Sequence, residues 1–150
     1  MNWTTDKSVA LSRFFVIVFT LLLAAACIAV PWFIPWFLER TAPKMLELLP
    51  FFFTTAYTTA AAGAGALYLL YRLLANLRKE QVFVPQNVQF LRMLSWCCFL
   101  AAVIFLLSGF YYLPFFLAAA AAAFMGLILR VVKNAFLQAV AIKEENDFTI

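Results

Sequence analysis

The sequence contains no histidine in its 150 residues, and only 12% of these residues are charged. The absence of histidine removes the commonest metal ligand and the commonest general base near neutral pH. Ordinary globular domains carry about 25% charged residues, so the low charge argues against a water-soluble domain and against a disordered regulator. With four glycines and six prolines, the chain also has too few of either for a collagen-like or linker-type sequence.

Hydrophobic residues, in contrast, make up 67% of the chain and occur in long continuous stretches. Residues 14–38, 48–71 and 93–129 contain no charged side chain over 25, 24 and 37 positions. A membrane-spanning helix needs about 20 apolar residues, so the first two stretches predict one helix each and the third predicts two. Gly109 and Pro114 mark the break within the third stretch.

These stretches predict an all-α, polytopic integral membrane protein with four transmembrane helices in an up-down bundle. We expect a single domain, residues 1–150, with helices near 12–38, 47–78, 87–110 and 113–143. Proline lacks a backbone N–H, so Pro31 and Pro35 should kink or end the first helix at its far side. A transmembrane β-barrel is excluded because its strands would alternate apolar and polar residues.

Basic residues are distributed unequally between the two ends of the predicted helices. Nine of the eleven lysines and arginines fall in the N-terminal segment, the connection after the second helix and the C-terminal segment. Because positively charged loops stay in the cytoplasm, we expect both termini to be cytoplasmic. We predict a multi-pass protein of the bacterial cytoplasmic (inner) membrane, with membrane lipid around it and no direct binding of nucleic acid.

No arrangement of residues typical of catalysis is present. The charge-free stretches that should cross the hydrocarbon core hold no carboxylate, lysine or arginine, which proton-coupled transport usually needs within the membrane. Cys27, Cys97 and Cys98 form no C-x-x-C pair, and we interpret them as small apolar side chains. Phosphate-binding glycine loops and clusters of metal ligands are missing as well. We therefore expect no enzymatic activity, no cofactor and no metal site.

The second predicted helix carries a seam of small and weakly polar residues. One row of this seam consists of Thr55, Thr59 and Gly63, and the adjacent row of Thr58, Ala62 and Ala66. Residues four apart share one helix face, and small residues let two helices approach closely in lipid. We favour this packing interpretation, with each hydroxyl bonded to its own helix, over a polar pathway or ligand pocket.

Two predicted cytoplasmic segments differ from generic membrane sequence. The elbow (residues 80–88) should contain an extended stretch before Pro85 begins the third helix. The fourth helix should outrun the bilayer by about two turns and lead to an acidic tail (residues 144–150). We expect the elbow and the tail to form one partner surface, which includes Phe83, Asn87, Val88, Arg92, Glu145, Asn146, Asp147 and Ile150.

These two segments resemble those of a bacterial family of small four-helix membrane proteins, catalogued as a domain of unknown function. The resemblance rests on the elbow, Val82-Phe83-Val84-Pro85-Gln86-Asn87-Val88 followed by Leu91-Arg92, and on the ending Glu145-Asn146-Asp147-Phe148-Thr149-Ile150. Glu80 and Gln81 stand where that family commonly has a glycine. Its genes often lie beside one for a small helix-turn-helix regulator, which implies a cytoplasmic regulator as partner and no enzymatic activity.

Two hypotheses about function follow. The first is a membrane-bound interaction or regulatory partner of a cytoplasmic protein, which binds through the elbow and the C-terminal helix. The alternative is a small transporter, or a membrane protein that binds lipid or another hydrophobic ligand through the threonine and glycine seam. A homo-oligomer is compatible with both hypotheses.

Overall fold

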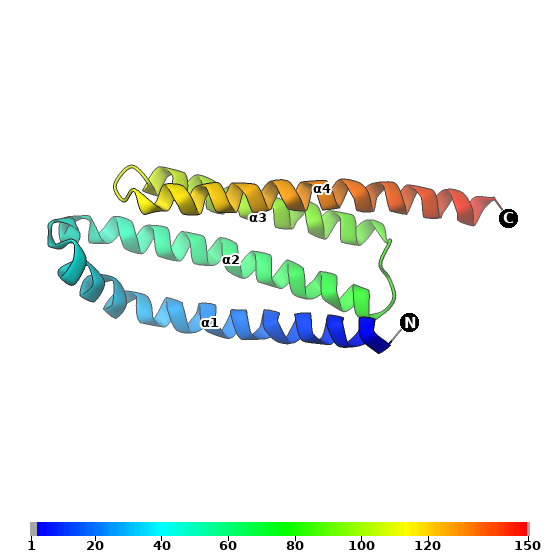
Figure 1. Ribbon diagram of the computed structural model, residues 1–150, viewed down its shortest axis with the longest axis horizontal. Coiled ribbons are helices and arrows are strands. Elements are labelled where there is room, and N and C mark those ends of the chain that lie inside the picture. Colours follow the sequence, from blue (N-terminus) through cyan, green and yellow to red (C-terminus); the bar gives the residue numbers. More distant parts are fainter. Residues whose placement is uncertain (1–2, 150) are drawn as a thin grey trace.

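A computed structural model of the protein describes residues 3–149, with side chains from Lys7 onward. The elements are α1 (Trp3–Thr41), the short 3-10 helix η1 (Pro43–Leu48), α2 (Leu49–Arg78), α3 (Pro85–Ser108) and α4 (Pro114–Phe148) (Figure 1). All four α-helices are long and apolar enough to cross a membrane. The predicted all-α fold with four transmembrane helices is confirmed, and the chain is a multi-pass membrane protein.

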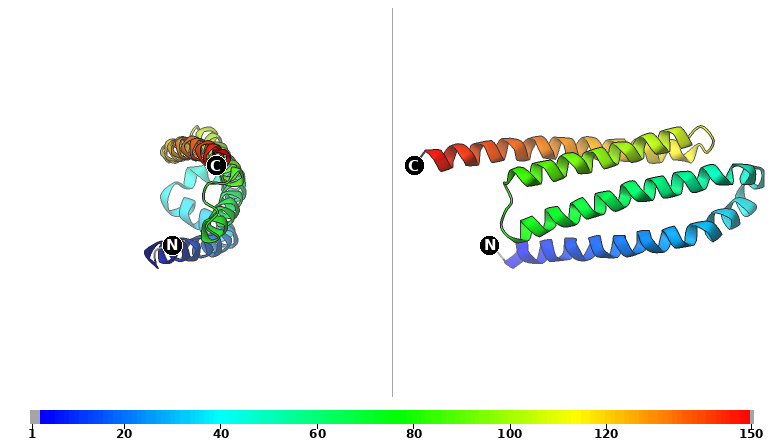
Figure 2. Two further views of the ribbon diagram at one scale, coloured as in Figure 1. Left: turned by 90° about the vertical axis from the view of Figure 1, so that its right-hand side faces the viewer. Right: turned by 180° about the vertical axis from the view of Figure 1, so that it is seen from behind.

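The four α-helices lie side by side in a curved layer. Each packs on its neighbours in sequence, and within the described residues α1 contacts neither α3 nor α4. Seen along the helices, the layer has the outline of a letter C (Figure 2). The up-down arrangement is therefore open, with α1 and α4 as its two edges.

The two ends of this layer differ in what they carry. The hairpin end holds η1 and the turn at residues 109–113, whereas the terminal end holds the elbow and the ends of α1 and α4 nearest the two termini (Figure 1). Four antiparallel helices necessarily bring both ends of the chain to the same side. The terminal end is also where the basic residues gather.

Helix α1 continues through both of its prolines, Pro31 and Pro35, as far as Thr41. A proline removes one backbone hydrogen bond and pushes the preceding turn away, which bends a helix. Figure 1 shows this bend near the hairpin end, and in Figure 2 the bent segment lies on the concave side of the layer. The prolines thus kink α1, which was one of the two outcomes expected of them.

Helices α1 and α4 both extend further at the terminal end than the sequence predicted. Helix α1 begins at Trp3 rather than near residue 12, and α4 ends at Phe148 rather than near residue 143. The predicted start near residue 12 followed the edge of a charge-free stretch, whereas the predicted end near residue 143 was placed beyond such a stretch and before the acidic residues. Charged residues in water do not interrupt a helix, so charge located the membrane spans better than the helix ends.

The tightest packing lies between α3 and α4. Gly126 of α4 faces the ring of Phe99 so closely that an added Cβ would stand 2.9 Å from it. Where α2 packs on α1, a Cβ added to Gly63 would stand 3.8 Å from Leu23, which is ordinary contact. Helix α1 is thus the more loosely held edge, and few of the large apolar side chains of the layer are buried within the protein, which leaves the others to meet lipid.

Candidate functional site

The elbow begins with a backbone turn that closes helix α2. The Gln81 N–H donates to the Asn76 carbonyl at 3.1 Å, and the Glu80 N–H donates to the Leu77 carbonyl at 3.2 Å. This pair of bonds is the Schellman motif, which requires a left-handed residue just after the helix. Glu80 fills that position with a φ of 61°. Helices that end in this way usually have glycine at that position, because a side chain is strained in the left-handed conformation.

Asn87 holds the rest of the elbow together from inside. Its Nδ2 donates to the carbonyls of Gln81 and Val82 at 2.8 Å each, and its Oδ1 accepts from Nδ2 of Asn76 at 2.8 Å. These bonds satisfy backbone groups that the extended stretch leaves without helical partners. The Asn87 side chain is fully buried, and Val88 beside it is buried too. The expectation that these two residues form a partner surface is wrong, because they face the protein interior.

The elbow contacts α4 through an aromatic pair. The ring centroids of Phe83 and Phe136 are 5.7 Å apart, and Val140, one turn further along α4, is buried. Phe83 nevertheless keeps 44% of its surface exposed, and Arg92 is exposed as well. Of the elbow residues expected at a partner surface, only Phe83 is thus accessible, together with Arg92 in the next turns of α3.

Beyond Val140, α4 continues as a single unaccompanied helix. All residues of this C-terminal extension (residues 141–149) are exposed, and Figure 1 shows it projecting past the other elements. It contains the acidic side chains of Glu144, Glu145 and Asp147, and Phe148 is 90% exposed. The Thr149 hydroxyl donates to the Glu145 carbonyl at 2.5 Å, within the helix.

The extension does not join the elbow in one surface, contrary to the prediction. At about 1.5 Å per residue, Glu145 stands about 13 Å beyond the elbow contact at Phe136. No hydrogen bond or ion pair links the extension to the elbow within residues 7–149. The predicted single surface does not form because α4 carries Glu145, Asn146 and Asp147 past the elbow (Figure 1). Ile150 lies outside the described residues.

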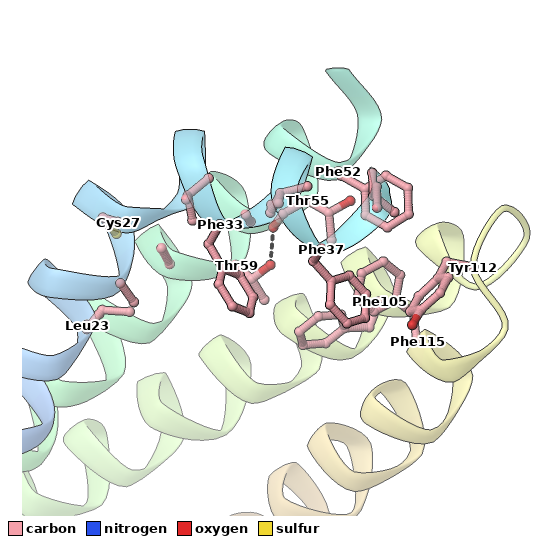
Figure 3. A pocket seen from close by; sticks show the side chains of 16 residues that line it. Leu23, Cys27, Phe33, Phe37, Phe52, Thr55, Thr59, Phe105, Tyr112 and Phe115 are labelled. Carbon is pink, nitrogen blue, oxygen red and sulfur yellow. Dashed lines mark hydrogen bonds between the residues drawn. The ribbon is translucent and has the colours of Figure 1, made fainter. Parts of the chain in front are cut away.

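At the hairpin end, an apolar cavity of about 450 Å³ lies between α1, α2, α3 and the start of α4. Figure 3 shows side chains from these helices around it, among them Cys27, Phe33, Phe37, Thr59, Phe105 and Phe115. The cavity occupies the space between α1 and α3, which do not touch, and the bent end of α1 contributes much of its wall. It can hold a hydrophobic molecule, since its lining offers few polar groups.

The threonine hydroxyls of helix α2 form two kinds of hydrogen bond, one within the helix and one to other elements. The hydroxyls of Thr54, Thr58 and Thr59 donate to carbonyls one turn earlier in α2. Thr55 alone reaches other elements: its Oγ1 lies 2.6 Å from Ser108 Oγ and 2.6 Å from Tyr111 Oη. Because Ser108 in turn donates to the Ile104 carbonyl at 2.8 Å, a consistent chain runs from Tyr111 through Thr55 to Ser108.

The structure separates the other seam residues among different surroundings. Thr59 lines the apolar cavity, and Gly63 faces α1. In the second row Thr58 is exposed, Ala62 is buried and Ala66 is half-buried. The seam therefore does not form a single polar pathway, because its rows face a cavity, two helices and lipid.

Comparison with known proteins places this arrangement in a family. The family described as "Protein of unknown function (DUF2975)" matches residues 36–150. The chain belongs to the DUF2975 family. The match covers the end of α1 and all of α2, α3 and α4, including the elbow and the C-terminal extension. No curated protein and no solved structure matches the chain.

Membership in DUF2975 confirms the resemblance to a four-helix family of unknown function, while a neighbouring regulator gene stays a prediction. Sequence reasoning missed three hydrogen-bonding partners. Asn76 bonds to Asn87 in the elbow, and Ser108 and Tyr111 bond to Thr55 of the seam. Asn76 stands just before the elbow and Asn87 within it, and two amides on either side of one turn are a signal that could have found the first of them. No group of three metal-ligating side chains occurs among the described residues of this DUF2975 protein.

Proposed function

We propose that this DUF2975 protein anchors a cytoplasmic partner protein at the membrane and binds it through the C-terminal extension. The observation that carries the proposal is that α4 continues as an exposed helix beyond every other element. A helical segment that packs on nothing has little intrinsic stability in water. A partner that covers this segment would supply the missing contacts.

The basic residues support a cytoplasmic position for the extension. Nine of eleven lysines and arginines lie at the terminal end of the layer, and positive loops remain on the cytoplasmic side. Only Arg40 and Lys44 lie at the hairpin end. This orientation, in the bacterial inner membrane, is part of the proposal.

The charge of the extension indicates the chemistry of its partner. Glu144, Glu145 and Asp147 lie at the C-terminus of a helix, where the helix dipole already places partial negative charge. Their mutual repulsion and the dipole both favour a positively charged partner surface. Phe148, 90% exposed, offers an apolar anchor beside these carboxylates. A small helix-turn-helix regulator fits this description, because DNA-binding proteins carry a basic surface.

Charge reversal in the extension tests the proposal. The triple variant Glu144→Lys, Glu145→Lys, Asp147→Lys and the wild type are placed in lipid nanodiscs, and binding of the purified neighbouring regulator is measured by biolayer interferometry. We expect at least a tenfold loss of affinity, because each reversed charge turns attraction into repulsion. The matched control, Lys143→Glu, changes charge on the same helix in the opposite direction and should keep or tighten binding. Equal binding of the triple variant and the wild type would refute the proposal.

A second candidate function rests on the apolar cavity. Its volume of about 450 Å³ lies within the range of about 300–1,000 Å³ typical of small-molecule sites. The protein would then bind a lipid chain or another hydrophobic ligand at the hairpin end. Ala60→Phe places a ring in the cavity and should abolish uptake of a fluorescent fatty acid, whereas Ala121→Phe, on an exposed face of α4, should not. Unchanged uptake in Ala60→Phe would exclude this function.

A further inference from the structure

A groove that is separate from the apolar cavity lies at the terminal end, where the first turns of α1 meet the last turn of α2. It encloses about 710 Å³. Three basic side chains line it, Lys7 and Arg13 from α1 and Arg78 from α2, and Phe14 and Ile17 form an apolar wall. No acidic side chain belongs to the lining that the structure describes. We propose that this groove binds the headgroup of an anionic phospholipid, with an acyl chain along the apolar wall.

Arg13 sets the level of this groove relative to the membrane. Its guanidinium donates to Tyr71 Oη at 2.8 Å and lies 5.0 Å from the centre of the Tyr71 ring. The charge-free span of α1 begins at the next residue, Phe14. Arginine over tyrosine at the edge of an apolar span is typical of the boundary between hydrocarbon and headgroups. The Arg13 guanidinium therefore lies where the lipid headgroups meet the hydrocarbon core.

Lys7 and Arg78 then lie at matching heights further out. Lys7 precedes Arg13 by six residues on α1, and Arg78 follows Tyr71 by seven residues on α2. At about 1.5 Å per residue both stand about 9–11 Å beyond the Arg13–Tyr71 pair. Their long side chains can bend back toward the headgroup layer. The groove thus places positive charge from two helices around the depth at which lipid phosphates lie.

Other basic residues at this end show why the groove is distinct. Arg72 lies over the rings of Tyr68 and Phe90, and Arg130 lies over those of Trp96 and Phe99. Neither of these two arginines belongs to the lining of the groove that holds Lys7, Arg13 and Arg78. Isolated arginines of this kind satisfy the topology rule alone, whereas basic pockets between transmembrane helices bind anionic lipid headgroups.

The apolar wall selects phospholipid over free phosphate. Phe14 is 60% exposed and Ile17 is 48% exposed, and both lie on the membrane side of the three cations. An acyl chain can cover these two side chains while the phosphate contacts the basic ones. Inorganic phosphate would contact only the basic side chains and would gain nothing from the apolar wall. This inference is independent of the partner proposed for the C-terminal extension.

Binding of defined lipids to the purified full-length protein tests the inference. Native mass spectrometry measures retention of phosphatidylglycerol, with phosphatidylcholine as the neutral comparison and inorganic phosphate as competitor. The wild type should retain phosphatidylglycerol in preference to phosphatidylcholine, and millimolar phosphate should not displace it. The double variant Lys7→Gln, Arg78→Gln should lose at least tenfold in affinity for phosphatidylglycerol. The matched control, Arg92→Gln with Lys133→Gln, removes two charges from the same end outside the groove and should bind as the wild type does.

Three results would overturn the inference. Equal losses in the groove variant and the control would mean that only the general positive charge attracts lipid. Complete displacement by inorganic phosphate would mean a simple anion site. Unchanged binding in the groove variant would mean that lipid binds elsewhere.

The four substituted residues include no fully buried side chain, and a helical circular dichroism spectrum with a wild-type melting temperature establishes that each variant is folded. Phe14→Ala, which shortens the apolar wall without changing charge, should weaken phosphatidylglycerol binding independently.

Discussion

Glu80 is the one described non-glycine residue with a positive φ, 61°, and it closes the turn that ends α2. The left-handed conformation costs an ordinary L-residue about 1–2 kcal/mol, part of which glycine recovers. We therefore expect Glu80→Gly to stabilise the protein by about 0.5–1 kcal/mol. Unfolding by denaturant in detergent micelles measures this gain.

The neighbouring residue provides the control for this prediction. Lys79 has a φ of −84°, so glycine at that position relieves no strain and only adds freedom to the unfolded chain. Lys79→Gly should lower stability. A stability loss in Glu80→Gly as large as that in Lys79→Gly would show that the left-handed turn carries no strain.

The hydroxyl of Thr55 gives a second prediction at the residue scale. Thr55→Val keeps the shape of the side chain but removes its bonds to Ser108 and Tyr111. Interhelical hydrogen bonds in membranes contribute about 0.6 kcal/mol on average and up to about 1.7 kcal/mol, so we expect a loss within this range. Thr54→Val is the matched control, because that exposed hydroxyl bonds only to Pro50 of its own helix. Equal losses in the two variants would contradict the role assigned to Thr55.

Residue-level roles were only partly predictable from sequence. The spacing of Thr55, Thr59 and Gly63 correctly indicates that they share a helix face, but not which neighbour each one meets. Asn87 was misassigned because an amide in a stretch that also holds Gln86 and Gln89 suggests a surface position. Its burial depends on the backbone carbonyls of Gln81 and Val82, and only the folded elbow brings these to it.

At the scale of elements, the close approach of α3 and α4 at Gly126 allows a prediction about the stability of a substituted protein. Gly126→Ala would place a Cβ within 2.9–3.1 Å of three atoms of the Phe99 ring. That ring also contacts Trp96 and Arg130, so it cannot shift freely. Overpacking costs about 1–3 kcal/mol, more than the gain of about 1 kcal/mol in helix propensity. We expect Gly126→Ala to lower the melting temperature in detergent.

Gly63→Ala should behave in the opposite way. Its added Cβ meets Leu23 at 3.8 Å, so the substitution keeps the gain in helix propensity without a clash. The same substitution, glycine to alanine, should thus lower the melting temperature at the tight α3–α4 interface and raise it at the looser α1–α2 interface. A higher melting temperature for Gly126→Ala than for Gly63→Ala would contradict this view of the packing.

Element positions were largely predictable, because a charge-free stretch of about 20 residues is a strong signal for a membrane span. The break at residues 109–113 and the start of α3 at Pro85 followed from proline and glycine positions. Helix ends in water were less predictable, since no local signal opposes continuation of α1 or α4 there. The error at the end of α4 mattered most, because it concealed how far the extension projects.

At the scale of the whole molecule, the open layer could not be read from the sequence. The helices are apolar on most faces, so no amphipathic stripe indicates which face meets protein and which meets lipid. The result is a layer whose two edges, α1 and α4, never meet within the described residues. Its concave side leaves room for the hairpin-end cavity, and its terminal end holds the basic groove and the C-terminal extension.

The proposed orientation is a property of the whole molecule as well. If the terminal end is cytoplasmic, a cysteine introduced at Thr41, which is exposed at the hairpin end, should react with a membrane-impermeant maleimide added outside intact spheroplasts. The control is a cysteine introduced at Lys143, which should react only after permeabilisation. The reverse pattern would place the extension outside the cytoplasm and remove the basis of the proposed function.

Deletion of residues 144–150 separates partner binding by the C-terminal extension from the stability of the bundle, because the described part of this segment is exposed throughout. Thermal stability in detergent and co-purification of the proposed partner, a helix-turn-helix regulator, from cells are measured together for the full-length and the shortened protein. We expect the shortened protein to keep its melting temperature and to lose the regulator. A shortened protein that keeps its stability and still recovers the regulator would contradict the claim that the C-terminal extension is the docking element.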